Sequence, residues 1–136
     1  MIFVDASALT AVIGDEPMSD RVLVCLESNA DFFTSPVAVY ETALAVARIA
    51  NYSVTEALAE VRDLVSRAGI IVEAIDDEHA SAALAAFSRF GKGRHPAGLN
   101  MGDCFAYACA KTRDAAILFV GNDFSRTDLR DALATP

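Results

Sequence analysis

Cysteine is scarce in this chain, and its three copies are poorly placed for pairing or for metal binding. Cys25, Cys104 and Cys109 are odd in number, and no two of them have the Cys-x-x-Cys spacing of zinc and redox motifs. We therefore expect reduced thiols that act as small apolar residues, as in a protein of the cytoplasm.

Long apolar runs and a basic N-terminal segment are also missing. No apolar stretch approaches the roughly 18 residues of a membrane span, and Asp5 interrupts the first apolar run, which argues against a secretory signal. Glycine and proline are few, with 7 and 4 copies, whereas 54% of the residues are hydrophobic. This composition predicts a well-filled core, and a chain of 136 residues has close to the commonest size of one domain. We expect a single domain over residues 1–136.

Short apolar runs alternate with helical patterns along the chain. Strands are predicted at residues 2–4, 31–34, 70–72 and 116–120. Helices are predicted at residues 8–13, from 16 onward, from 36 onward, and at 53–68, 76–90 and 102–113, with a short one after residues 125–128. Strands that alternate with helices favour the α/β class, as a three-layer α/β/α sandwich whose sheet is mainly parallel and covered on both faces.

Local signals refine this outline. Ser7 is well placed to cap the first helix. Residues 125–128 have the spacing of a capping box, with aspartate in the last place. In the helix that begins at Pro36, intervals of three and four predict one core-facing stripe, formed by Val37, Tyr40, Leu44 and Ala47.

Four carboxylates occupy positions where a ligand site is expected. Asp5 ends the first strand and Asp123 follows the fourth, and ligands of open parallel sheets bind beyond the carboxyl ends of the strands. Asp103 lies in the first turn of its helix, and Glu41 stands beside predicted core residues. Taken singly, each acid has a structural explanation: a helix cap for Asp5, a favourable helix dipole for Asp103, a turn for Asp123, and a salt bridge with Arg48 for Glu41.

Taken together, acids at these positions imply a cation. Two carboxylates about 4 Å apart repel by roughly 4 kcal/mol at an effective dielectric of 20, so three or four of them would not converge without a positive ion. Oxygen ligands in this number suit Mg²⁺ or Mn²⁺. Such ions activate water and stabilise the departing oxygen of a phosphodiester, which indicates a metal-dependent nuclease.

The segments that carry these acids resemble those of a known family. They are Val4-Asp5-Ala6-Ser7-Ala8-Leu9, Tyr40-Glu41, the run Gly102–Ala108, and Gly121-Asn122-Asp123-Phe124. In order and spacing, over nearly the whole chain, they are similar to those of PIN-domain ribonucleases. The VapC type, the toxin half of bacterial toxin–antitoxin pairs, is the most similar.

This resemblance implies an α/β/α sandwich and an endoribonuclease that cleaves RNA with Mg²⁺, for which Mn²⁺ can substitute. It also implies a homodimer and inhibition by a cognate antitoxin protein. By position, Asp5, Glu41 and Asp103 match the family's metal-binding and catalytic acids. Either Asn122 or Asp123 fills the fourth place, and we favour Asp123 as the acid with Asn122 in support.

Further residues are candidates for supporting roles. Ser7 matches a small polar residue beside the first acid, and it either bonds a ligand or caps its helix. Thr127-Asp128 resembles the family's ending. The basic loop before Asp103 is either an RNA contact or simply solvated, and its charged and polar residues are Lys92, Arg94 and His95. The net charge of -8 opposes RNA binding unless metal ions neutralise part of it; it would also suit a basic protein partner.

Rival functions make different demands on the sequence. A phospho-acceptor receiver domain would need paired acids after the first strand and an aspartate after the third, where this chain has Asp5 alone and Glu73. A phosphatase of the haloacid type would need an acid at position 7, where serine stands. The remaining alternative is a catalytically idle protein-binding module, which a metal-binding measurement would separate from a nuclease.

Overall fold

A parallel sheet forms the centre of the molecule. The structure, a computed structural model, describes residues 1–134. Its strands are β1 (Ile2–Val4), β2 (Phe32–Thr34), β3 (Ile71–Val72) and β4 (Ala116–Leu118). They pair in the order β3-β2-β1-β4, and every pairing is parallel. The predicted parallel sheet is thus confirmed, with strands somewhat shorter than expected.

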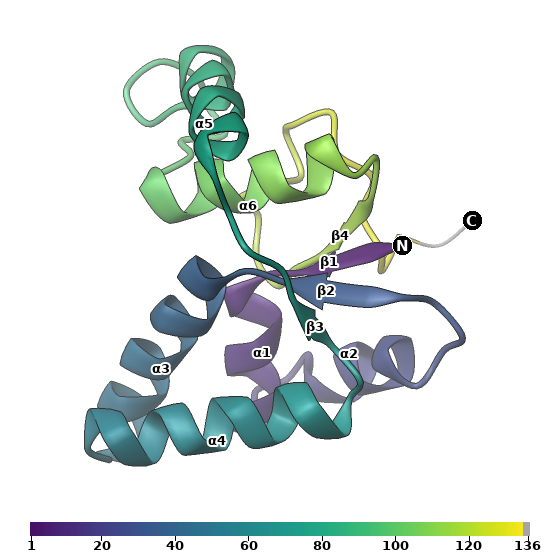
Figure 1. Ribbon diagram of the computed structural model, residues 1–136, viewed down its shortest axis with the longest axis vertical. Helices are drawn as coiled ribbons and strands as arrows, with labels where there is room; N and C mark the ends of the chain where they lie inside the picture. Colours follow the sequence, from purple (N-terminus) through teal and green to yellow (C-terminus); the bar gives the residue numbers. More distant parts are fainter. Residues whose placement is uncertain (135–136) are drawn as a thin grey trace.

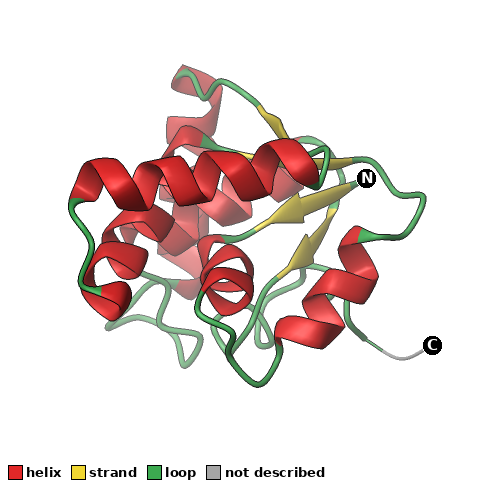
Figure 2. Ribbon diagram, turned by 90° about the horizontal axis from the view of Figure 1, so that it is seen from below, coloured by secondary structure: helices red, strands yellow, loops and turns green. Residues whose placement is uncertain are grey.

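Helices cover both faces of this sheet (Figure 1). One face carries α1 (Ala6–Ile13), α2 (Ser19–Leu26), α3 (Pro36–Ala50) and α4 (Val54–Arg67). The other carries α5 (Asp77–Phe90) and α6 (Met101–Thr112). Seen from below, the short strands lie in the interior among the helices (Figure 2). The three-layer α/β/α sandwich predicted from the sequence is confirmed.

Two apolar clusters join the layers, one on each face of the sheet. Because successive residues of a strand point to opposite faces, Phe3 and Ile117 are buried against α5 and α6, whereas Val4 and Leu118 are buried against the other helices. All three cysteines are free, as expected. No helix within residues 1–134 is long and apolar enough to cross a membrane.

Most helix ends follow the signals in the sequence. The exceptions are the starts of α1 and α2 and the predicted terminal helix. Ser53 forms a capping box at the start of α4, and Gly69, with φ of +67°, follows its end. The cap of α1 is Asp5 and not Ser7, because the extended backbone of Asp5 lets its carboxylate accept from the Ser7 N–H. In addition, α2 begins at Ser19, later than predicted.

The predicted terminal helix does not form within the described residues. Residues 121–134 run in turns and bends, apart from one isolated bridge between Ile117 and Asp131. The Thr127 hydroxyl donates to the Phe124 carbonyl at 2.7 Å and accepts from the Leu129 N–H. These hydrogen bonds of Thr127 stabilise a turn in place of a first helical turn, so the capping-box spacing of residues 125–128 does not lead to a helix.

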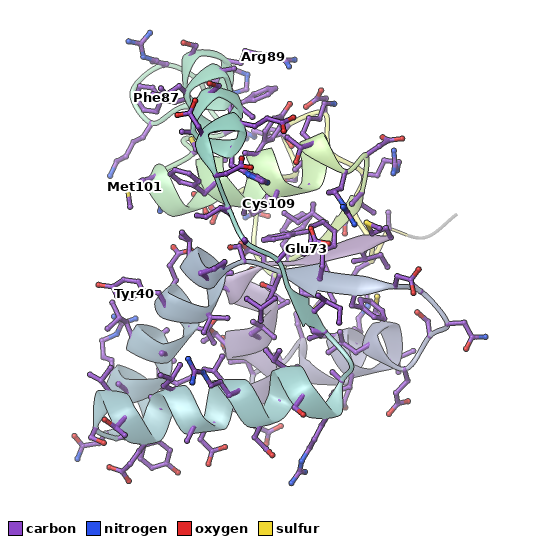
Figure 3. The ribbon with its side chains drawn as sticks, in the orientation of Figure 1. Tyr40, Glu73, Phe87, Arg89, Met101 and Cys109 are labelled. Carbon is purple, nitrogen blue, oxygen red and sulfur yellow. The ribbon has the colours of Figure 1, made fainter. Side chains whose placement is uncertain are left out.

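The core face of α3 also differs from the prediction. Its buried residues are Ala38, Thr42, Ala43 and Val46. Tyr40 is 64% exposed and projects away from the body of the molecule (Figure 3). Small side chains face inward because α3 packs against α1, α4 and α6 at once, and a tyrosine on that side would keep these helices apart.

Candidate active site

A cavity of about 360 Å³ lies at the carboxyl edge of the sheet, lined by all four predicted acids. Asp5 comes from the end of β1, Glu41 from α3, Asp103 from α6 and Asp123 from the loop after β4. Its size falls within the roughly 300–1,000 Å³ range of ligand sites. Asp5 and Asp123, which are 118 residues apart in sequence, are therefore brought to one edge by the parallel topology, and Glu41 and Asp103 reach it from helices.

Asp5 is fixed by the junction of β1 and α1. Its N–H donates to the Leu118 carbonyl of β4 at 3.0 Å. Its carboxylate accepts from the N–H and the hydroxyl of Ser7, at 3.1 and 2.5 Å. The Ser7 hydroxyl in turn accepts from the Val120 N–H at 3.0 Å, so one serine ties Asp5 to the segment after β4. Burial raises the pKa of Asp5 against these hydrogen bonds, and the charge of Asp123 adds to the rise.

Asp103 is held by a capping box at the start of α6. Its carboxylate accepts from the Asn100 N–H at 3.1 Å, while its own N–H donates to the Asn100 side chain at 2.9 Å. The side chain is buried. Burial raises the pKa of Asp103 to about 6 against the hydrogen bond from the Asn100 N–H, which lowers it, and the charges of Asp123 and Asp5 add to the rise.

Glu41 lies over a glycine. An added Cβ at Gly102 would overlap the Glu41 carboxylate, so the absence of a side chain there allows α3 and α6 to bring Glu41 beside Asp103. None of the ion pairs within residues 1–134 includes Glu41, so the alternative of a salt bridge with Arg48 is wrong. Burial raises the pKa of Glu41 to about 7, and the charges of Asp5 and Asp103 add to this effect.

Asp123 lines the cavity from the loop after β4. It follows Gly121, whose φ of +105° lets the chain turn sharply after β4, and its side chain is exposed. Of the two neighbours that the sequence left open, Asp123 lines the cavity and Asn122 does not. Asn122 instead lies in the turn, where its carbonyl accepts from the Ser125 hydroxyl at 2.8 Å.

The arrangement suits a hard divalent cation in its chemistry. Its donors are carboxylate oxygens, with hydroxyl and amide oxygens from Ser7, Thr10 and Asn100 beside them, which is the ligand type that Mg²⁺ and Mn²⁺ prefer. Within residues 1–134, however, no three His, Cys, Asp or Glu side chains are already grouped closely enough to hold an ion. Burial is the main cause of the raised pKa values of Glu41 and Asp103, and the charges of the neighbouring acids add to it; a cation would offset both effects.

Several predicted site residues lie outside this cavity. Asp128 accepts from the Tyr107 hydroxyl at 2.5 Å and from the Lys111 ammonium at 2.7 Å. Although partial burial acts in the opposite direction, these hydrogen bonds lower the pKa of Asp128 to about 2. Thr127 lies beside it in the turn described above. Glu73, considered for a receiver domain, pairs with Arg113 at 3.0 Å.

The basic loop joins α5 to α6 and does not line the cavity either. Lys92 and Arg94 are exposed, and the Arg94 guanidinium lies 5.2 Å from the centre of the Phe87 ring. His95 accepts from the Ala97 N–H at 3.0 Å and packs edge-on against Phe90. These contacts shape the loop and leave its two cations free to meet solvent or a ligand.

Some residues around the acids were not assigned a site role from the sequence: Thr10, Glu16 and Asn100, which line the cavity, and Gly102, which lies against the Glu41 carboxylate. The spacing from Asn100 to Asp103 is that of a capping box and could have been recognised. The contact between Gly102 and Glu41 joins two distant helices and leaves no local signal. Glu16 was assigned to the start of a helix, whereas it lies in the turn after α1 and reaches the cavity.

Comparisons with a family model, with sequence relatives and with solved structures found clear matches. The model of the PIN domain family matches residues 2–129. Ribonuclease VapC30 of Mycobacterium tuberculosis is 40% identical over 128 residues, which cover 93% of this chain and 94% of the relative. A VapC ribonuclease of Rhizobium meliloti is 35% identical and covers 95% of this chain and 99% of its own. The crystal structure of Mycobacterium tuberculosis VapC20, described as a sarcin-ricin loop cleaving toxin, superposes with a TM-score of 0.77 at 17% identity, over 95% and 96% of the two chains.

Proposed function

The chain belongs to the PIN domain family, and from this membership we propose that it is a metal-dependent endoribonuclease acting as the toxin of a toxin–antitoxin pair. The observation that carries the proposal is the meeting of four carboxylates from β1, α3, α6 and the loop after β4 in one cavity. Relatives with 35% to 40% identity over nearly their whole length are named as ribonucleases, which supports hydrolysis of RNA. A receiver domain is disfavoured because Glu73 is paired away from the cavity.

In this proposal Asp5, Glu41, Asp103 and Asp123 are the metal-binding and catalytic acids. Mg²⁺ is the expected cation and Mn²⁺ its substitute, because all four ligands are hard oxygens. When bound, such an ion lowers the pKa of a water ligand and stabilises the negative charge of a phosphodiester under attack.

Other polar residues of the cavity hold the acids in position. Ser7 orients the Asp5 carboxylate by two hydrogen bonds, and the Asn100 N–H holds that of Asp103. Burial and the charges of Asp5 and Asp103 raise the pKa of Glu41 to about 7, so this carboxyl holds a proton near neutral pH unless a cation stabilises its charged form. Asn122 supports the turn that carries Asp123.

The remaining predicted residues lie outside the cavity and are proposed to have supporting roles. Asp128 holds the loop after β4 against α6 through Tyr107 and Lys111, and Thr127 stabilises the turn beside it. Lys92, Arg94 and His95 are proposed to approach the RNA backbone, and the exposure of Lys92 and Arg94 supports this assignment.

Partners and compartment also belong to the proposal. We expect one domain over residues 1–136 that works in the cytoplasm as a homodimer and is inhibited by a cognate antitoxin. Exposed apolar side chains support protein partners. Tyr40 on α3 and Met101 on α6, which are 64% and 73% exposed, project from the same side of the molecule (Figure 3).

The proposal is tested by incubating purified protein with total RNA in Mg²⁺, in Mn²⁺ and in a chelator, followed by mapping of the cut ends. We expect defined cuts that require the metal and disappear in Asp5→Asn and Asp103→Asn. Asparagine caps a helix about as well as aspartate, so the start of α1 should persist in Asp5→Asn. Asp63→Asn removes the same charge from an exposed pair on α4 and should cleave normally. Equal cleavage by wild type and the cavity variants would contradict the assignment.

A further inference from the structure

The cavity extends beyond the four acids, along α1 and α3. Besides the acids and their neighbours, its lining includes Thr10 of α1, Ala45 of α3 and Glu16 of the turn after α1. Glu16 follows Asp5 by eleven residues, and the eight residues of α1 between them rise about 12 Å at 1.5 Å each. The charges that raise the pKa of Glu41 come from Asp5 and Asp103, and Glu16 is not among them. Glu16 therefore marks a separate, distal end of the cavity.

The Glu16 side chain is turned back toward α1. The backbone N–H of Glu16 donates to the Ala11 carbonyl at 2.9 Å, and this hydrogen bond fixes the turn after α1. A Cβ built on Gly14 would lie 3.6 Å from the Glu16 Cγ, so the side chain runs over the end of α1 and not out into solvent. This path explains how a residue in a turn comes to line the cavity.

One oxygen of this carboxylate lacks a partner. Glu16 Oε2 is buried, and within residues 1–134 no group donates a hydrogen bond to it. A buried acceptor without a donor costs free energy, and the cost is larger for a charged group. Rotation about the last side-chain bond of Glu16, which has a broad energy minimum, exchanges the buried oxygen with the other one, so the carboxylate can adjust to a hydrogen-bond donor that enters the cavity it lines.

The chemistry of this end restricts what it can recognise. A carboxylate repels the phosphates of RNA and accepts from hydrogen-bond donors. Unpaired bases of single-stranded RNA offer such donors on their edges, and a carboxylate is a natural acceptor for the cytosine amino group. The distal end also lies beyond the acids proposed to act on the phosphodiester, where a neighbouring nucleotide must be accommodated.

We propose that Glu16 determines base specificity by accepting a hydrogen bond from the exocyclic amino group of an unpaired base beside the scissile phosphate. The inference rests on the proposed ribonuclease function. It predicts that bases with an amino group, such as cytosine, are preferred over uracil, which has a carbonyl oxygen in that place.

The test compares oligocytidylate with oligouridylate of equal length, since cytosine has an amino group at C4 and an acceptor at N3, whereas uracil has a carbonyl oxygen at C4 and a donor at N3. Fluorescence anisotropy in a chelator measures binding without cleavage. Wild type should bind the cytidine oligomer about tenfold more tightly, which is the usual effect of one hydrogen bond to a charged group. Glu16→Ala should bind both equally, and Glu16→Gln, which keeps the shape, should retain only part of the preference.

Asp15→Asn is the matched control. Asp15 is the adjacent acid, is exposed and does not line the cavity, and asparagine tolerates its φ of +49°. This variant loses the same charge and should keep the wild-type preference. Cytidine-to-uridine changes beside a mapped cleavage site, assayed with Mg²⁺, should alter kcat/KM in the same way.

Three results would overturn the inference. The first is a wild type that binds both oligomers equally, and the second is a Glu16→Ala variant with an unchanged preference. The third is a Glu16→Gln variant that keeps the base preference and loses Mn²⁺ affinity in calorimetry, which would assign Glu16 to the cation. A protein that shows the base preference in binding but cuts no RNA with metal would instead contradict the proposed function.

Discussion

Replacing Glu41 with glutamine should stabilise the metal-free protein, although most substitutions in a folded protein destabilise it. Glutamine keeps the shape of the side chain and removes one charge from the cavity. Burial, with the charges of Asp5 and Asp103, raises the pKa of Glu41 from 4.5 to about 7. Because Glu41 has no ion pair within residues 1–134, its neutralisation removes repulsion without breaking a salt bridge.

The magnitude follows from the two pKa values of Glu41. Between pH 4.5 and about 7 the folded protein binds more protons at this carboxyl than the unfolded chain, so the free energy of unfolding falls as the pH rises through this window. The full rise corresponds to about 3 kcal/mol, at about 1.4 kcal/mol per pH unit. Because the side chain is only half-buried, solvent screening reduces the expected penalty to about 1–2 kcal/mol.

Differential scanning calorimetry in a chelator measures this penalty. At pH 8 the midpoint of Glu41→Gln should exceed that of wild type by about 3–8 °C, given the usual relation between stability and midpoint at this size. At pH 4, where Glu41 is protonated in both states, the two proteins should unfold together. Glu60→Gln makes the same chemical change on the exposed surface of α4 and should shift the midpoint little at either pH. A lower midpoint for Glu41→Gln at pH 8, or an equal gain at both pH values, would refute the reasoning.

Three further predictions concern the residues around the acids. Gly102→Ala should abolish cleavage and weaken Mn²⁺ binding in calorimetry, because the new methyl group would displace the Glu41 carboxylate; wild-type affinity would contradict this. Arg94→Ala should weaken RNA binding and reduce the salt dependence of the binding constant by about one counterion, and an unchanged slope would make the loop merely solvated. Asp128→Asn should lower the unfolding free energy by about 1 kcal/mol through its contacts with α6, while a loss of Mn²⁺ affinity would place it in the site.

The order and type of most elements could be predicted because their signals are local. Short apolar runs gave the four parallel strands, and caps and stops such as Ser53 and Gly69 bounded α4 closely. The inner face of α3 could not be predicted in the same way. A stripe that included Tyr40 and Leu44 has helical spacing, but the helix is packed on several sides, and the smaller Ala43 and Val46 face inward. Which stripe is buried depends on neighbouring helices that the local pattern does not contain.

The same distinction between local and long-range signals applies to the residues of the site. Asp5 and Asp123 could be predicted because strand ends of a parallel sheet meet at one edge. Glu41 and Asp103 were weaker candidates when taken singly, the resemblance to PIN domains supported both, and the cavity contains both. Glu16 was missed because its role depends on a side chain that folds back from a turn.

The central claim is that the four acids form one cation site that cleaves RNA, and Mn²⁺ binding measured by isothermal titration calorimetry tests it most directly. Wild type at pH 7.5 should bind Mn²⁺, and Asp5→Asn, Glu41→Gln and Asp103→Asn should each bind it far more weakly. The exposed Asp63→Asn should bind like wild type. Because one site is disrupted each time, combining two cavity substitutions should abolish the heat of binding. Undiminished Mn²⁺ affinity in any two of the single cavity variants would contradict the account.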